Sequence, residues 1–135
     1  MIRFEVETTR QTEMVPITDQ VQEAVTKLSI QDGAVVVFIP HTTAAVTINE
    51  SADPMVAHDI IAILDRVIPF HDEEYRHMEA NSAAHIKAVL VGTSETVMVR
   101  NGHLHLGTWQ GLFLCEFDGP RHRLVDVGAA GDGCA

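Results

Sequence analysis

The pattern of apolar and polar positions predicts three strands in the first fifty residues of the chain. Residues 2–8 alternate between apolar and charged side chains, which is typical of a half-buried strand. Residues 34–39 form a continuous apolar, largely β-branched run that ends at Pro40, and such a run predicts a strand that is covered on both faces or buried in an interface. A shorter run over residues 43–49 predicts the next strand.

Apolar residues at spacings of three and four predict two helices in the first half of the chain. The first helix starts near residue 19, with Thr18 or Asp19 as its N-cap. The second starts at Asp53-Pro54, because an aspartate can accept hydrogen bonds from free N–H groups and a proline fits the first helical position. It is expected to end near residue 67.

The second half of the chain is predicted to hold a third helix and four more strands. Residues 69–79 read as a loop, and Asn81 or Ser82 is expected to cap a helix over residues 83–91. The dipeptide Asn101-Gly102 lies between two alternating runs, at 96–100 and 103–106, and predicts a type I′ hairpin. The last two strands are expected at residues 112–117 and 122–127.

These elements place the chain in the α+β class. About seven strands and three helices predict a mixed, mostly antiparallel sheet with helices on one side. With 135 residues the chain is long enough to bury a core without disulfides, and residues 1–127 are expected to form a single domain. Residues 128–135 carry too little apolar surface to order themselves and are expected to form a flexible tail.

Charge and composition narrow the classes of partner. The formal net charge of −10 argues against binding to nucleic acid or to an anionic membrane surface. Nowhere in the sequence do 18 apolar residues follow one another, so a membrane span is not expected. The chain has two cysteines, Cys115 and Cys134, without metal-type spacing, and this predicts a cytoplasmic protein with reduced thiols.

Polar residues gather at both ends of the strand expected at 43–49. His41, Thr42 and Thr43 precede it, and Asn49 and Glu50 close it. For a lone histidine a structural hydrogen bond is the usual role, but the adjacent threonines make a binding role equally plausible. If the strands on either side of His41 pair as a hairpin, these groups lie at opposite edges of the sheet. The stretch then forms two half-sites, each of which needs a partner, and the His77–Lys87 segment is the expected partner of one of them.

A second concentration of candidate groups lies around the third helix. His77, Glu79 and His85 could together hold Zn²⁺ with one open position, although their spacing fits no standard zinc motif. Lys87 is one of two lysines in the chain, and it is either a surface group or a placed phosphate ligand.

Further polar residues lie next to the strands predicted in the last third of the chain. Thr108, Trp109 and Gln110 lie between Gly107 and Gly111, where a tryptophan usually packs or anchors an interface. His103 and His105 could chelate a metal but are assigned to an exposed strand face, and His58 is assigned to a helix surface or a subunit contact. Glu116 needs a cationic or metal partner if its face of the strand is covered.

Four long motifs, in this order, resemble the YjbQ-type family, a family of secondary thiamine-phosphate synthases. They are HTTAAVTINESADP, YRHMEANSAAHIKAVLVG, NGHLHLGTWQG and CEFDGPR, and the resemblance covers residues 3–127. The resemblance implies a small α+β protein that assembles as a homotrimer. It also implies a weak thiamine-phosphate synthase activity, which joins a pyrimidine diphosphate to a thiazole phosphate and releases pyrophosphate, beside an unsettled primary role.

The resemblance also implies a set of functional residues. These are His41, Asn49, Glu50, Asp53, His77, Glu79, His85, Lys87 and residues 107–110, with Glu116 and Arg121 following. The chain departs from the family pattern at Ala80, where the family often has glycine, and near Ala83, where it often has an acidic residue. Ala80 restricts the backbone of that loop, and the missing carboxylate removes one metal or base contact.

Our leading hypothesis is an enzyme that acts on a phosphorylated small molecule. His41, His77 and His85 would bind a divalent metal, zinc or magnesium, or an anion. Glu50 or Glu79 would act as a base or metal ligand, and His41 and Lys87 would share in catalysis. The substrate-binding candidates are Thr42, Thr43, Asn49, Lys87, Thr108, Gln110 and Arg121. The alternative is a non-catalytic metal- or anion-binding trimer.

Overall fold

The computed structural model describes residues 1–131, which form three helices and eight strands. The helices are α1 (Thr18–Lys27), α2 (Pro54–Val67) and α3 (Ser82–Val91). The strands are β1 (Ile2–Glu7), β2 (Glu13–Pro16), β3 (Gly33–Phe38), β4 (Ala44–Glu50), β5 (Ser94–Arg100), β6 (His103–Leu104), β7 (Gln110–Glu116) and β8 (His122–Ala129). The α+β class is confirmed, and the predicted elements all occur, with β2 as an additional strand.

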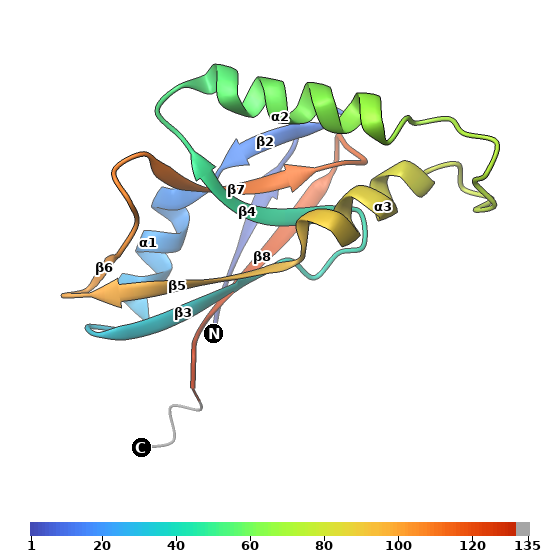
Figure 1. Ribbon diagram of the computed structural model, residues 1–135. Coiled ribbons are helices and arrows are strands. Elements are labelled where there is room, and N and C mark those ends of the chain that lie inside the picture. The colour runs from blue at the N-terminus through green and yellow to red at the C-terminus, as the bar shows by residue number, and fades with distance from the viewer. Residues whose placement is uncertain (132–135) are drawn as a thin grey trace.

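The strands form two antiparallel sheets rather than one mixed sheet. The larger has the order β1-β8-β3-β5-β6, and the smaller has the order β2-β7-β4. Every pair is antiparallel. The main core fills the space between the sheets and includes Val35, Val46, Leu114 and Val125, all fully buried. Helix α1 adds apolar side chains to this core, while α2 and α3 lie over the other face of the smaller sheet (Figure 1).

Strand β3 is buried on one face only, so coverage of both faces by the chain itself was wrong for residues 34–39, and burial of the outer face in an interface stays a prediction. Val35 and Val37 point into the core and are fully buried, whereas Phe38 is 43% exposed. Met98 on β5, which pairs with Ala34, is 61% exposed on the same outer face. The continuous apolar run therefore supplies the core with one set of side chains and leaves the other set on the outer surface of the larger sheet.

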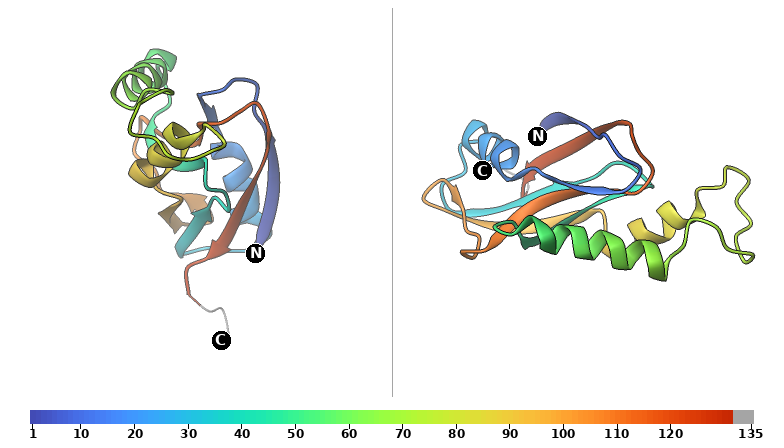
Figure 2. Two further views of the ribbon diagram at one scale, coloured as in Figure 1. Left: turned by 90° about the vertical axis from the view of Figure 1, so that its right-hand side faces the viewer. Right: turned by 90° about the horizontal axis from the view of Figure 1, so that it is seen from above.

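A second, smaller core joins α3 to the smaller sheet. Ala84 and Ala88 of α3 pack against Ala45, Cys115 and Phe117. Small side chains on both sides let the helix approach the sheet closely. This contact sets the position of α3, and the segment between α2 and α3 extends beyond the body of the sheets (Figure 2).

The helix starts show which capping predictions hold. Asp53 caps α2 as expected, since its carboxylate accepts a hydrogen bond from the N–H of Met55 at 2.9 Å. The prediction was wrong for α1: the N-cap is Ile17, and Thr18 accepts instead from the N–H of Leu112. For α3 the predicted N-cap position, Asn81, is confirmed, but its side chain makes no capping hydrogen bond.

The predicted hairpin and the predicted tail can both be compared with the structure. Asn101 and Gly102 have φ values of 53° and 79°, as a type I′ turn requires, so that turn is confirmed. Strand β8 continues to Ala129, beyond the expected boundary at 127. Residues 132–135 of the expected tail lie outside the described residues. Within residues 1–131, no helix has the length and apolar character needed to cross a membrane.

Candidate functional site

His41 and His85 line one pocket, although 44 positions of sequence separate them. The pocket has a volume of about 400 Å³ and lies where the end of β3 meets the C-terminal half of α3. Its lining residues are His41, Thr42, His85, Ala88, Val89, Gly92 and Thr93. Its polar side chains are two histidines and two threonines, and no carboxylate lines it. We call it the histidine pocket.

The backbone fixes the tautomer of His41. The N–H of Leu124 on β8 donates a hydrogen bond to Nε2 of His41 at 2.9 Å, so Nε2 must carry a lone pair. The pKa of His41 is lowered, chiefly by partial burial and next by the positive charge of Arg123, which favours the neutral ring. The proton of the neutral ring then lies on Nδ1. In residues 1–131 the one buried side-chain nitrogen or oxygen without a hydrogen-bond partner is Oδ1 of Asn81, so Nδ1 of His41 is not shut off from solvent. Nδ1–H is therefore a donor that solvent or a ligand can reach.

His77 extends this site along the outer end of α3. The rings of His77 and His85 meet edge to face, with their centroids 5.2 Å apart. Both line a neighbouring pocket of about 370 Å³, to which Arg76 and Ser82 also contribute. Arg76 adds a cation and Thr93 a hydroxyl that sequence analysis did not single out. Arg76 could have been found from its place in the YRHMEANS motif, whereas nothing in the sequence distinguished Thr93.

The three candidate metal ligands do not form a metal site within one chain. Among residues 1–131, no group of three histidine, cysteine, aspartate or glutamate side chains has an arrangement that could hold a metal ion. His41 uses the Nε2 lone pair for Leu124, and His77 faces Glu79 at 3.8 Å. Because a metal takes a ring nitrogen that carries no proton, the Nδ1–H of His41 suits an anion rather than a cation.

The two candidate phosphate cations already have carboxylate partners. Lys87 is 3% exposed, with Nζ 2.5 Å from Asp65 of α2 and 5.9 Å from the centre of the Phe117 ring. Arg121 donates to a carboxylate oxygen of Asp118 at 3.0 Å, and the same oxygen accepts from the side-chain amide of Asn81. Neither cation lines the histidine pocket, and Lys87 joins two helices instead.

A buried ion pair lies directly behind His41. Glu116 and Arg123 are both nearly inaccessible and make a two-point contact between carboxylate and guanidinium. Burial raises the pKa of Glu116, but the hydrogen bonds from Arg123, the Asp118 N–H and Thr8 outweigh it, so the net pKa is lowered and the carboxylate is ionised. Arg123 also donates to Thr43, at 2.8 Å to the hydroxyl and 3.1 Å to the carbonyl oxygen.

The other candidates gather at the opposite end of β4. Glu50 pairs with Gln110 in the sheet register, and the N–H of Ser51 donates to the carbonyl of Trp109 at 2.8 Å. Gln110 turns its own side chain back to accept from the Gly107 N–H, and Asn49 likewise accepts from the Glu50 N–H. These residues therefore stabilise their own loops, and the carboxylate of Glu50 has no hydrogen bond or ion pair in residues 1–131.

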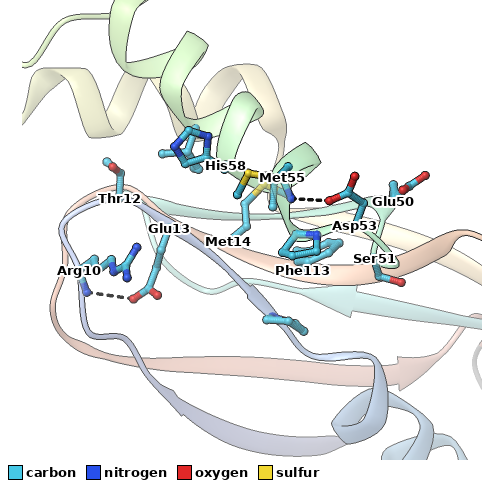
Figure 3. Close-up of a pocket in the computed structure, with 14 residues that line it drawn as sticks. Arg10, Thr12, Glu13, Met14, Glu50, Ser51, Asp53, Met55, His58 and Phe113 are labelled. Carbon is cyan, nitrogen blue, oxygen red and sulfur yellow. Dashed lines mark hydrogen bonds between the residues drawn. The ribbon is translucent and has the colours of Figure 1, made fainter.

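Glu50 and Asp53 line a pocket of about 500 Å³ between β2 and α2, shown in Figure 3. Glu50 and Asp53 lie at one end of it, Arg10 lies at the other, and Met14, Met55 and Phe113 lie between (Figure 3). His41, His77 and His85 do not contribute to this pocket.

The polar groups at the two ends of β4 thus belong to separate sites. Seven residues of extended strand span about 20 Å at roughly 3.3 Å per residue. The predicted hairpin across His41 does not form, because β3 and β4 belong to different sheets. The two half-sites are nevertheless separate, because they lie at opposite ends of β4. The His77–Lys87 segment, expected to complete one of them, contributes His85 to the pocket of His41 from the same chain, with His77 in the neighbouring pocket. Lys87 lines neither pocket.

Comparison with known proteins assigns the chain to a family. Its residues 2–132 match the model of the family described as UPF0047 protein YjbQ-like. It is 50% identical to the UPF0047 protein YugU of Bacillus subtilis over 120 residues, covering 89% of this chain and 91% of that protein. It is 46% identical to a UPF0047 protein of Methanocaldococcus jannaschii over 132 residues, covering 98% and 95%.

Solved structures show the same fold. The crystal structure of a YjbQ/UPF0047 family protein from Clostridium acetobutylicum aligns with a TM-score of 0.93 at 48% identity, over 96% of this chain and all of that one. A conserved protein from Thermus thermophilus aligns with a TM-score of 0.89 at 42% identity, again over 96% of this chain. The sequence motifs, the two-sheet fold and these relatives agree, and the chain belongs to the YjbQ-like UPF0047 family.

Proposed function

We propose that this protein is an enzyme that binds the phosphate or pyrophosphate group of a small-molecule substrate in the histidine pocket. The observation that carries the proposal is the composition of that pocket: two histidines, two threonines and no carboxylate. The chain as a whole carries a net charge of −10, so a pocket free of carboxylates is a place where an anion escapes local repulsion.

The donors suit a phosphoryl group. The Nδ1–H of His41 and the hydroxyls of Thr42 and Thr93 supply hydrogen bonds to phosphate oxygens, and these bonds strengthen when the acceptor is charged. His85, beside His77, supplies a second imidazole that can donate when protonated. A pyrophosphate leaving group gains negative charge as its bond to carbon breaks, so donors already in position stabilise the transition state.

Thiamine-phosphate synthesis is the reaction we assign as one activity of the site. In that reaction the thiazole nitrogen forms a bond to the methylene carbon of the pyrimidine, and the bond from that carbon to the diphosphate oxygen breaks. Support comes from the motif resemblance and from the anion pocket. We further propose that the protein works as a homotrimer, in which a neighbouring chain brings Glu50 to the edge of the histidine pocket, where its carboxylate offsets the positive charge that the thiazole nitrogen gains as the new bond forms.

Binding of pyrophosphate tests the anion site directly. Isothermal titration calorimetry of the wild type with pyrophosphate, with and without Mg²⁺, should show binding in both conditions. His85→Ala and Thr42→Val should each weaken it about tenfold, since a hydrogen bond to a charged group contributes about 1.5 kcal/mol. His103→Ala removes an exposed histidine at the far end of β5 and should bind as the wild type does. Equal affinity in all four proteins would refute the site.

Turnover tests the reaction. Purified protein should form thiamine phosphate from the two phosphorylated precursors, and its gene should rescue a thiamine auxotroph, whereas His85→Ala should do neither. Light scattering of the same sample should give three times the chain mass. Absence of product and of rescue with the wild type would remove the activity, and a monomeric mass would remove the trimer.

A non-catalytic anion-binding protein is the second candidate. It is favoured by the lack of a carboxylate base in the histidine pocket, because Glu50 lies about 20 Å away along β4 and Glu79 is exposed outside it. Tight pyrophosphate binding without turnover on a panel of phosphorylated substrates would support this candidate over the enzyme.

A further inference from the structure

The segment that carries His41 and Thr42 is held at both of its ends by strand β8. At one end the Leu124 N–H donates to Nε2 of His41 at 2.9 Å. At the other end the guanidinium of Arg123 donates to both oxygens of Thr43. Thr42 lies between these two anchors, exposed and on the wall of the histidine pocket. Neighbouring residues of one strand therefore hold the segment whose donors face the anion.

Arg123 can act as an anchor because its own position is fixed. Nε of Arg123 donates to Oε1 of Glu116 at 2.9 Å, and Nη2 contacts the other carboxylate oxygen. Glu116 in turn accepts from the Thr8 hydroxyl at 2.7 Å and from the Asp118 N–H at 3.0 Å. Each oxygen of the carboxylate thus has two partners, and the guanidinium has a single fixed plane.

A buried ion pair is an expensive way to stabilise a core. Glu116 is fully buried and Arg123 is 2% exposed, and taking both charges from water costs more than well-packed apolar residues would. Such a pair is better understood where a planar, directional donor is needed, because a guanidinium presents its N–H groups in a fixed fork. Here Nε and Nη2 of the fork hold Glu116, which fixes the direction in which Nη2 also donates to the carbonyl and hydroxyl of Thr43, two residues after His41.

We propose that Arg123, locked by Glu116, is a positioning residue that holds Thr42 and the Nδ1–H tautomer of His41 toward the bound anion. This inference rests on the proposed function of the histidine pocket. Loosening the Thr43 end would let the His41 ring turn away from the Leu124 N–H. In water a neutral imidazole favours the Nε2–H form, so the fixed tautomer would be lost together with the aligned donors.

Arg123→Lys tests the proposal, because it retains the charge but cannot form the two-point contact. Pyrophosphate affinity should fall about tenfold, and ¹⁵N spectra of the histidine rings should show His41 as a mixture of tautomers. Two milder substitutions, both at Thr43, test the same contact in case Arg123→Lys does not fold. Thr43→Val removes the hydroxyl that Arg123 contacts and should weaken binding about threefold, while Thr43→Ser retains the hydroxyl and should behave as the wild type.

The role of Arg123 and the anion-binding function can fail independently, and different results would show each failure. Unchanged affinity and an unchanged His41 tautomer in Arg123→Lys and Thr43→Val, with only a lower melting temperature, would show that the pair serves stability alone and would overturn the proposal. A wild type that binds no pyrophosphate would instead end the proposed function. The ¹⁵N measurement needs no ligand, so it still decides whether Arg123 sets the tautomer.

Discussion

The ammonium of Lys87 lies 2.5 Å from the carboxylate of Asp65, and this contact ties α3 to α2. The two partners differ in exposure: the Lys87 side chain is 3% exposed and the Asp65 side chain 44%. Because one charge is buried and the other is in water, the two halves of the pair are not equivalent in their effect on stability.

Removing Asp65 should therefore destabilise the fold more than removing Lys87. Asp65→Asn leaves a buried ammonium without a charged partner and should lower the free energy of unfolding by about 3 kcal/mol. Lys87→Met keeps the apolar contact with Phe117 and leaves Asp65 in water, so the loss should be about 1 kcal/mol. Urea unfolding of both variants and of the double variant measures the coupling.

The double variant should resemble Lys87→Met, because the unpartnered charge is gone. In addition, Lys87→Met should bind pyrophosphate as the wild type does, since Lys87 does not line the histidine pocket. Equal losses for the two single variants, or a large loss of pyrophosphate affinity in Lys87→Met, would contradict this account.

Ala80 occupies a backbone conformation that suits glycine. Its φ is 60°, in the left-handed region, where a Cβ costs about 1 kcal/mol. Ala80→Gly should raise the free energy of unfolding by about 0.5 kcal/mol, after the added flexibility of the unfolded chain is counted. Thermal and urea unfolding measure the change. Ala83→Gly, at the buried second residue of α3, should instead destabilise by at least about 1 kcal/mol, and a loss in Ala80→Gly would contradict the assigned strain.

The ion pair between Arg3 and Asp126 predicts a dependence of stability on acid. Hydrogen bonds from Arg3 hold the pKa of Asp126 below its usual value near 3.8. A depressed pKa in the folded state contributes stability that is complete well above pH 3.8 and is lost as the pH falls through the folded pKa.

Asp126→Asn and Arg3→Gln should both remove this contribution. Between pH 4 and pH 2 their free energies of unfolding should fall less steeply than that of the wild type, as guanidinium titrations at each pH would show. Asp19→Asn alters an aspartate without an ion pair among residues 1–131 and should retain the wild-type slope. Parallel slopes in all the proteins would exclude the pair as a source of acid sensitivity.

Cys115 should be chemically inert in the folded protein. Burial in the smaller core raises the pKa of its thiol to about 12, so almost no thiolate exists at pH 8. In a Cys134→Ser background, Ellman's reagent should leave the native protein unmodified over minutes and label one thiol per chain in denaturant. Rapid labelling of the native protein would mean that the contact between α3 and the sheet opens readily.

Local sequence signals predicted most of the elements because each depends on neighbouring residues. Asp53-Pro54 begins α2 as expected, and Asn101-Gly102 makes the turn between β5 and β6. Strand β2 escaped prediction because four residues ending in proline carry no clear alternation, and its pairing with β7 comes from a segment 100 positions away. Asn81 holds the predicted N-cap position of α3 without a capping hydrogen bond, and its amide donates instead to Asp118, a partner remote in sequence.

The sequence by itself determined the family, the α+β class and the presence of histidines and threonines at the end of one strand, since motifs and periodicity are local. Only the tertiary structure decided which of these groups share a site. The packing of α3 on β4 places His85 beside His41 in one pocket, and Lys87 forms an ion pair with Asp65 instead of lining that pocket. The tertiary structure also aimed Arg123 at Thr43 from the far end of the chain. Such pairings depend on side-chain direction and on contacts across many residues, which no periodicity along the chain records.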